Sequence, residues 1–198
     1  MVVMAAHAWG TNAEMIADIA DLGYIGDTVL DATYGLGRFW SKYQPNKLIS
    51  NDAHPLRGDL SYDFTSFPDD WEGQYDTVVF DPPYKLNGTP TLGKMDEDYG
   101  IATYTSLNDK LDLISRGVTE CVRVTKAGGT ILVKVQDQVA SGRMWFQSDM
   151  VRDTLCGIAN KVAVFHFLTK PRPQPEGRRQ VHARNNYSTL LIFKKLYK

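Results

Sequence analysis

Residues 77–84 read Thr-Val-Val-Phe-Asp-Pro-Pro-Tyr, and this stretch decides the fold. Thr77 to Phe80 are apolar or β-branched throughout, which is typical of a strand buried on both faces of a parallel sheet. The two prolines that follow have no N–H donor and end the strand. Asp81 and Tyr84 therefore stand just after the carboxyl end of a buried strand, the edge at which α/β sheets bind ligands.

Strand patterns alternate with helical patterns on both sides of this stretch. We expect strands at 28–31, 47–50, 130–135, 162–168 and 189–193, a weak strand near 60–62, and helices at 11–22, 107–121 and 148–159. No helical pattern separates the last two strands, which indicates an antiparallel hairpin at one edge. The sequence predicts one α/β domain over residues 1–198, with a mostly parallel sheet covered on both faces.

The composition is that of an ordinary globular protein. Apolar residues make up 43% and charged residues 23%, which excludes collagen-like, mostly disordered and disulfide-framework proteins. We expect no membrane span and no signal peptide. Cys121 and Cys156 form no ligand or redox motif, so two buried thiols and a cytoplasmic location are predicted. His7, His54 and His166 share no ligand spacing, so no metal site is expected.

Charge is divided unevenly along the chain. Residues 161–198 hold nine lysines and arginines and one acid, whereas residues 1–160 hold thirteen lysines and arginines and 22 acids. This asymmetry indicates that the C-terminal end faces a polyanion, although a merely solvated basic loop is the alternative. Residues 170–187 lie between the last two predicted strands and form a predicted basic hairpin loop. The candidate nucleic-acid contacts in it are Lys170, Arg172, Arg178, Arg179, His182 and Arg184.

The segment from Asp31 to Gly37 follows the first predicted strand and contains two glycines. Glycine lets the backbone approach a ligand closely, although a tight turn alone would use the same residues. Asp52 ends the next strand 21 residues after Asp31, where an acid can accept both hydroxyls of a ribose. A dinucleotide fingerprint needs a third glycine where Trp40 stands, so a nicotinamide dehydrogenase is disfavoured.

The tetrapeptide Asp81-Pro82-Pro83-Tyr84 offers hydrogen-bond acceptors and few donors, because each proline removes an N–H. A pocket of acceptors suits an amino group, which is a donor. Tyr84 adds a flat face on which a planar ring can stack. These residues together predict a site for an exocyclic amine on an aromatic heterocycle.

Asp-Pro-Pro-Tyr after an apolar strand resembles the catalytic motif of the amino-methyltransferases, which methylate adenine N6 or cytosine N4 with S-adenosylmethionine. The resemblance covers most of the chain: residues 8–12 are similar to the segment that helps hold the methionine moiety, and residues 63–64 to the segment that contacts the cofactor's adenine. It implies catalytic residues Asp81, Pro82, Pro83 and Tyr84, and cofactor-binding residues Thr11, Asn12, Asp31, Thr33, Tyr34, Gly35, Gly37, Asp52, Asp63 and Phe64.

The resemblance further implies a Rossmann-like class I methyltransferase fold with a seven-stranded, mostly parallel sheet and S-adenosylmethionine as cofactor. The expected substrate is a nucleic-acid base amine, with DNA favoured over RNA. An RNA base, a protein amide nitrogen or a catalytically silent binding module are the alternatives. Residues 85–104 form a predicted lid loop. Since no large target-recognition region is present, stringent recognition of a duplex site would need a homodimer or a partner.

Overall fold

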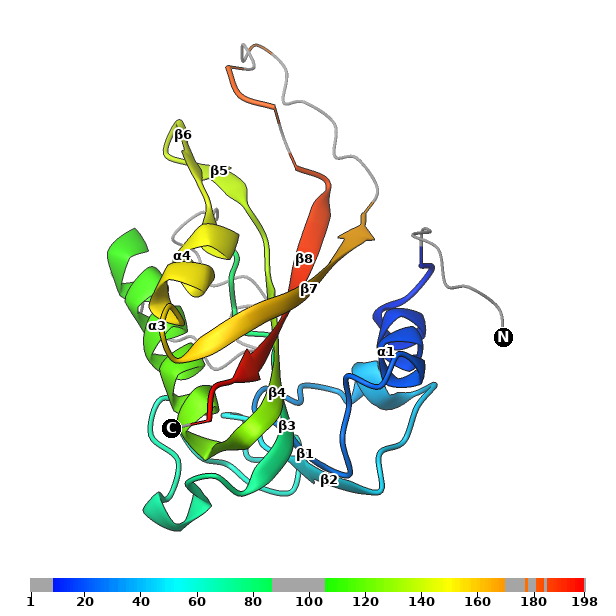
Figure 1. The fold of residues 1–198 in the computed structure, drawn as a ribbon. Helices are drawn as coiled ribbons and strands as arrows, with labels where there is room; N and C mark the ends of the chain where they lie inside the picture. Colours follow the sequence, from blue (N-terminus) through cyan, green and yellow to red (C-terminus); the bar gives the residue numbers. More distant parts are fainter. Residues whose placement is uncertain (1–8, 87–105, 170–176, 178–180, 184, 198) are drawn as a thin grey trace.

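The computed structural model describes residues 9–86, 106–169, 177, 181–183 and 185–197, and its centre is a six-stranded sheet (Figure 1). The strand order is β2-β1-β3-β4-β8-β7, and β5 and β6 form a separate two-stranded sheet. The strands are β1 (Thr28–Asp31), β2 (Lys47–Ser50), β3 (Tyr75–Phe80), β4 (Thr125–Val135), β5 (Gln138–Ala140), β6 (Arg143–Trp145), β7 (Ala159–Leu168) and β8 (Tyr187–Lys195).

The first four strands of this order run parallel, and β8 is antiparallel to both β4 and β7. This confirms the predicted mostly parallel sheet with a C-terminal antiparallel hairpin. Asp31 is level with Ser50 on β2 and with Val79 on β3. The residues that follow β1, β2 and β3 therefore leave the sheet at one common edge, the carboxyl edge.

The predicted count of seven strands is wrong, because the main sheet has six. The weak strand expected near 60–62 is reduced to one isolated bridge between Leu60 and Asn51. The Asn51 side chain explains this outcome: its amide accepts from the Tyr62 N–H and donates to the Tyr62 carbonyl. The backbone groups that a further strand would use are thus bonded to a side chain.

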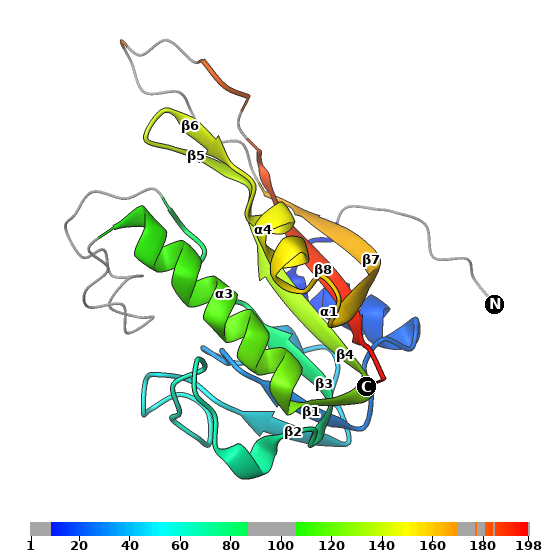
Figure 2. The ribbon, with the colours of Figure 1, turned by 60° about the vertical axis from the view of Figure 1, so that its left-hand side comes forward.

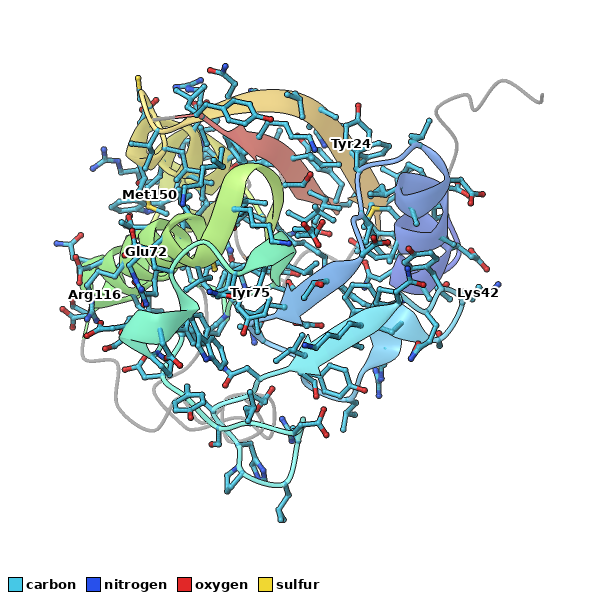
Figure 3. All side chains as sticks on the ribbon, turned by 60° about the horizontal axis from the view of Figure 1, so that its bottom comes forward. Tyr24, Lys42, Glu72, Tyr75, Arg116 and Met150 are labelled. Atoms are coloured by element: carbon cyan, nitrogen blue, oxygen red, sulfur yellow. The ribbon has the colours of Figure 1, made fainter. Side chains whose placement is uncertain are left out.

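Helices cover both faces of the sheet. On one face lie α1 (Asn12–Asp21) and the short η1 (Arg38–Trp40), and on the other lie α3 (Leu107–Val124) and α4 (Gln147–Thr154). The short η2 (Asp69–Trp71) precedes β3. Figure 3 shows Lys42 beside α1 on one side of the sheet, and Arg116 and Met150 on the opposite side. The parallel strands are thus the middle of three layers, as predicted.

The helix ends follow from local sequence. Thr11 caps α1 through the predicted capping box with Glu14. Helix α4 ends at Thr154, five residues before the predicted end, because Gly157 has a positive φ of 79° and turns the chain toward β7. Cys121 is buried as expected, whereas Cys156 lies in this turn and is exposed, which corrects the prediction of two buried thiols.

The β5–β6 hairpin was not predicted from the sequence. Its turn residues Ser141 and Gly142 both have positive φ, at 51° and 72°, as in the two-residue turns that match strand twist. The hairpin extends beyond the carboxyl end of β4 (Figure 2). His182 contacts it through a 2.8 Å hydrogen bond between Nε2 and the Gly142 carbonyl. No helix in the described part of the chain is long and apolar enough to cross a bilayer.

Candidate active site

The three strand ends that the sequence singled out meet at the carboxyl edge of the sheet. The Asp81 N–H donates to Thr33 Oγ1 at 2.7 Å, and the Thr33 N–H donates to Asp31 Oδ1 at 3.1 Å. The Gly35 N–H donates to Asp52 Oδ2 at 2.7 Å. The glycine turn after β1 is therefore tied to the residues that follow both neighbouring strands, as predicted.

Asp31 is buried inside the turn that it begins. Its Oδ2 accepts a 2.7 Å hydrogen bond from the Trp40 indole, so the side chain joins β1 to η1. Burial raises the pKa of Asp31 to about 7, against the hydrogen bonds from Trp40 and Thr33, and the nearby charges of Asp81 and Asp52 raise it further. The observed role of Asp31 is thus to hold the glycine turn, and its contact with a cofactor stays a prediction.

The turn itself depends on its glycines. Gly35 and Gly37 have φ of 59° and 66°, a region that other residues rarely adopt. The Tyr34 ring packs directly over Gly37, where any Cβ would collide with it. Asn51, which sequence reasoning missed, also holds this turn. Its backbone carbonyl accepts from the Tyr34 N–H at 2.8 Å, and its side-chain amide donates to the Ala32 carbonyl at 3.1 Å.

Asp52 is nearly buried, and each of its oxygens already accepts a backbone N–H, from Gly35 and from His54. A carboxylate oxygen can accept more than one hydrogen bond, so the geometry leaves capacity for ribose hydroxyls. Phe64 packs edge-on against Phe80 with 5.1 Å between ring centroids, which places residues 63–64 beside the end of β3. The Asp63 carboxylate is exposed and accepts from the Thr65 N–H and hydroxyl.

The two predicted residues at the start of α1 behave differently. Thr11 Oγ1 accepts from the Glu14 N–H as the helix cap. Asn12 Oδ1 is buried and has no hydrogen-bond partner among the described residues. A buried polar oxygen without a donor is unusual in a folded protein and is the kind of group that a ligand satisfies.

Asp81 shows the same property at the catalytic tetrapeptide. Its Oδ2 accepts from Lys134 Nζ at 3.1 Å, whereas its Oδ1 is buried without a partner among the described residues. Burial raises the pKa of Asp81, and the Lys134 charge and hydrogen bond act in the opposite direction. The Pro82 carbonyl accepts the Tyr84 N–H at 2.7 Å, so a tight turn centred on Pro83 gives the tetrapeptide its shape.

Two glutamines hold this tetrapeptide in place. The Tyr84 carbonyl accepts from Gln138 Nε2 at 2.8 Å and from Gln147 Nε2 at 2.9 Å. Gln147 also donates to the Gln136 carbonyl at 2.6 Å. The β5–β6 hairpin and helix α4 are therefore both bonded to the candidate catalytic residues. Asp137 accepts from the N–H and the hydroxyl of Ser148, a residue in the first turn of α4.

Besides Asn51, sequence reasoning missed Lys134 and Gln147 at the site. Lys134 has one available signal, since it is a single charge within the apolar stretch from Ile131 to Val135. A charge in a strand buried on both faces needs a partner. Gln147 has no comparable signal, because a glutamine at the start of a helix is usually exposed.

Several predictions concern residues outside the described ranges. Most of the lid segment 85–104 lies outside them, as do Lys170, Arg172, Arg178, Arg179 and Arg184 of the basic loop. Of that group the structure describes His182, which contacts the β5–β6 turn. No cluster of potential metal ligands occurs in the described part of the chain.

No family model matches the chain, and no curated protein sequence matches it. Solved structures share its fold. The N-methyltransferase NodS from Bradyrhizobium japonicum WM9, in complex with S-adenosyl-L-homocysteine, is 11% identical with a TM-score of 0.58 over 92% of this chain and 85% of that chain. A Clostridium thermocellum protein described as an rRNA methylase is 12% identical with a TM-score of 0.53 over 100% of this chain and 99% of that chain. The chain thus has the Rossmann-like fold of the class I methyltransferases.

Proposed function

We propose that this protein transfers a methyl group from S-adenosylmethionine to the exocyclic amine of a nucleic-acid base, with adenine N6 or cytosine N4 of DNA as the favoured target. The observation that carries this proposal is the buried Oδ1 of Asp81, which has no hydrogen-bond partner within the described residues and lies at the carboxyl edge of the sheet. Beside it stand the Pro82 carbonyl and the Tyr84 ring. An amino group on a planar base would supply the donor for Asp81 Oδ1, and its ring is of the kind that can stack on a tyrosine.

The residues present fit the cofactor that this reaction needs. Asn12 Oδ1, which has no partner in the described ranges, and the Asp52 carboxylate offer hydrogen-bond acceptors, and the turn at Gly35 and Gly37 allows close backbone approach. These residues would hold its amino-acid and ribose parts, with residues 63–64 near its adenine. When bound, S-adenosylmethionine supplies a methyl group activated by the attached sulfonium.

The chain's own contribution is to bind and orient the amine. The lone pair of an aromatic amine is delocalised into the ring, which makes it a weak nucleophile. Hydrogen bonds from the amine to Asp81 Oδ1 and the Pro82 carbonyl favour a pyramidal nitrogen with a freer lone pair. The Asp81 carboxylate then stabilises the positive charge that develops on that nitrogen, an interaction stronger in the transition state than in the ground state.

A paired base cannot reach such a recessed site. It would have to be flipped out at a cost of a few kcal/mol or be unpaired already, and stacking on Tyr84 would offset about 1–3 kcal/mol. The basic loop 170–187 is the proposed phosphate contact, because its lysines and arginines carry the charge that steers a polyanion. The proposal includes a homodimer of this protein for recognition of a duplex DNA site.

The proposal is tested by incubating the purified protein with labelled S-adenosylmethionine and separate pools of single-stranded DNA, duplex DNA, RNA and protein. Digestion to nucleosides and mass spectrometry then identify the product. We expect N6-methyldeoxyadenosine or N4-methyldeoxycytidine. Methylation confined to RNA would replace the DNA preference, and label confined to protein, or found in no pool, would refute a nucleic-acid base as substrate.

Asp81→Ala should abolish transfer while leaving cofactor binding by calorimetry nearly unchanged. Asp76→Ala is the matched control, because Asp76 lies on the same strand at the opposite end and pairs with Lys126. It should keep wild-type turnover. Undiminished turnover by Asp81→Ala would remove Asp81 from the mechanism.

A further inference from the structure

Lys134 is a charged residue in the buried interior of the sheet. It is 5% exposed, and its neighbours Val133 and Val135 on β4 are fully buried. Its Nζ donates to Asp81 Oδ2 at 3.1 Å and lies 5.3 Å from the Phe39 ring centroid and 5.5 Å from that of Tyr84. The ammonium group is thus enclosed by two aromatic rings and one carboxylate at the candidate active site.

Stability alone does not explain this pair. Removing two charges from water costs several kcal/mol per ion, and apolar residues of similar volume are often as stable as a buried ion pair. The same two strands carry a second lysine–aspartate pair, Lys126 with Asp76 at 2.6 Å, near their amino ends. That pair is substantially exposed, so it avoids the desolvation cost that the Lys134–Asp81 pair bears.

The two oxygens of the Asp81 carboxylate have different partners. Lys134 occupies Oδ2, whereas Oδ1 is buried without a partner among the described residues. The Asp81 backbone N–H is fixed separately by Thr33 Oγ1. The carboxyl group can turn about one bond, and the lysine contact restricts that rotation.

We propose that Lys134 is a positioning residue that fixes the Asp81 carboxylate in its charged form, with Oδ1 directed to the amine of the bound base. This inference rests on the proposed function of the site. A fixed positive charge repels the positive charge that develops on the target nitrogen, so the direct effect of Lys134 on methyl transfer is unfavourable. Any gain in rate from the lysine must therefore come through Asp81, by keeping its carboxylate charged and oriented.

The charges around Asp81 make this role measurable. Burial raises the pKa of Asp81 above its usual value, and the charge and hydrogen bond of Lys134 offset part of this rise. Asp31 on β1 is a nearby acidic group that interacts with Asp81. Burial lowers the pKa of Lys134, but Asp81 and Tyr84 outweigh that effect and the net pKa is above its usual value. Loss of the lysine charge should therefore leave Asp81 protonated up to a higher pH.

The experiment compares the pH dependence of turnover in wild type, Lys134→Met, Lys134→Arg and Lys126→Met, at saturating cofactor and DNA. For Lys134→Met we expect the acidic limb to move up by at least about one pH unit, which is a loss of about tenfold below both midpoints. Activity should recover at alkaline pH. Lys134→Arg keeps the charge and should keep the wild-type limb, as should Lys126→Met.

A purely structural role for Lys134 gives a different result, because it would lower turnover by one factor at every pH. That outcome would overturn the inference. If Lys134→Met fails to fold, as judged by circular dichroism, Lys134→Gln replaces it, since the amide can still donate to Asp81 without a charge. The same shift of the acidic limb is expected, and its absence is decisive against the proposal.

A second readout does not depend on activity. Carboxyl carbon NMR of protein labelled in aspartate, with Asp81 assigned by its loss in Asp81→Asn, measures the titration midpoint directly. The midpoint should rise in Lys134→Met. If it rises but the wild type methylates no nucleic acid, the proposed function fails, while the part of the inference that Lys134 keeps the Asp81 carboxylate charged stands. If the wild type is active and the midpoint stays in place, the inference about Lys134 fails.

Discussion

Three aspartates, Asp31, Asp52 and Asp81, meet at the carboxyl edge of the sheet, and their surroundings give them different tasks. Asp31 is bonded to Trp40 and Thr33 inside the chain, and Asp52 holds the backbone of Gly35. Asp81 keeps one oxygen that has no partner in the part of the chain that the structure describes. The side chain with unused acceptor capacity in a buried position is therefore the one best placed to bind a donor group.

Asp31 predicts a specific dependence of stability on pH. The pKa of Asp31 is about 7 in the folded protein, so the proton is kept up to about that pH, whereas the unfolded chain loses it near the usual aspartate pKa of 3.8. The unfolded state therefore binds fewer protons in this window, and the free energy of unfolding falls as pH rises, by up to about 4 kcal/mol from this residue.

Asp31→Asn should lack this pH-dependent contribution to the free energy of unfolding. Its altered hydrogen bond to the Thr33 N–H changes that free energy by an amount that does not vary with pH. Urea unfolding of both proteins between pH 4 and 8 measures the difference. The wild type should lose stability relative to Asp31→Asn as pH rises. Parallel curves for the two proteins would contradict the assignment.

Gly37 and Gly35 provide a second comparison at this scale. Both have positive φ, but a Cβ at Gly37 would collide with the Tyr34 ring, whereas a Cβ at Gly35 meets nothing. Gly35→Ala should cost about 1–2 kcal/mol of stability from the backbone alone. Gly37→Ala should cost more and weaken S-adenosylmethionine binding by calorimetry. A Tyr34→Ala background should remove most of the difference, and equal effects of the two glycine variants would rule out the packing argument.

The residues Asp81 to Tyr84 could be predicted because their signal is local: an apolar strand followed by a sequence that cannot continue it. Lys134 could not be assigned to Asp81, since the partners are 53 residues apart and meet only through strand pairing. Asn51 and Gln147 were missed for the same reason. Contacts that depend on tertiary structure leave little trace in the spacing of residues along the chain.

At the scale of elements, the β5–β6 hairpin and helix α4 are connected to the candidate catalytic turn through the carbonyl of Tyr84. Gln138 comes from the hairpin and Gln147 from the helix, and both donate to this one acceptor. The position of the tetrapeptide therefore depends on two elements that follow it in the chain. Displacement of the hairpin would therefore change the position of Tyr84.

Gln147→Leu should separate these effects. The change preserves much of the side-chain volume but removes the donor to the carbonyls of Tyr84 and Gln136. We expect a loss of about 1–3 kcal/mol of stability and a fall in kcat larger than any change in cofactor affinity. Ser148→Ala is the control, because Ser148 is the next residue on α4 and bonds to Asp137 rather than Tyr84. Equal kcat values for Gln147→Leu and wild type would show that the glutamine is only structural.

The longer elements could be predicted from periodicity, and the short ones could not. The stripe of apolar residues in α3 and the runs in β3 and β8 identify those elements without ambiguity. The hairpin strands β5 and β6 are three residues each, which is too short for any period to appear. The expected strand at 60–62 does not form, because the Asn51 side chain is hydrogen-bonded to the N–H and the carbonyl of Tyr62.

At the scale of the whole molecule, the three-layer fold, a sheet between two layers of helices, could be predicted from the order of strand and helix patterns along the chain. The number of strands could not. Charge is also divided along the chain, with the excess of lysine and arginine confined to residues 161–198. This division predicts that nucleic-acid binding depends strongly on salt, because each neutralised phosphate releases counterions.

Neutralisation of about four phosphates would lower the affinity for duplex DNA on the order of 100-fold between 50 and 200 mM salt. Fluorescence anisotropy over this range measures the slope. Arg178→Ala with Arg179→Ala should reduce the slope by about two, whereas Lys47→Ala, at the amino end of β2, should leave it unchanged. An affinity that stays flat across the salt range would exclude the basic loop as a phosphate contact.

The position of β8 has a consequence for how the molecule is made. This strand is the last of the sheet to be synthesised, yet it lies between β4 and β7. It forms the backbone hydrogen bonds on the edge of each that faces the other. Until residues 187–195 have left the ribosome, β4 and β7 each expose an open row of backbone groups to any other nascent chain. Slow translation of residues 187–195 would therefore prolong the time in which β4 and β7 can pair with another chain and aggregate.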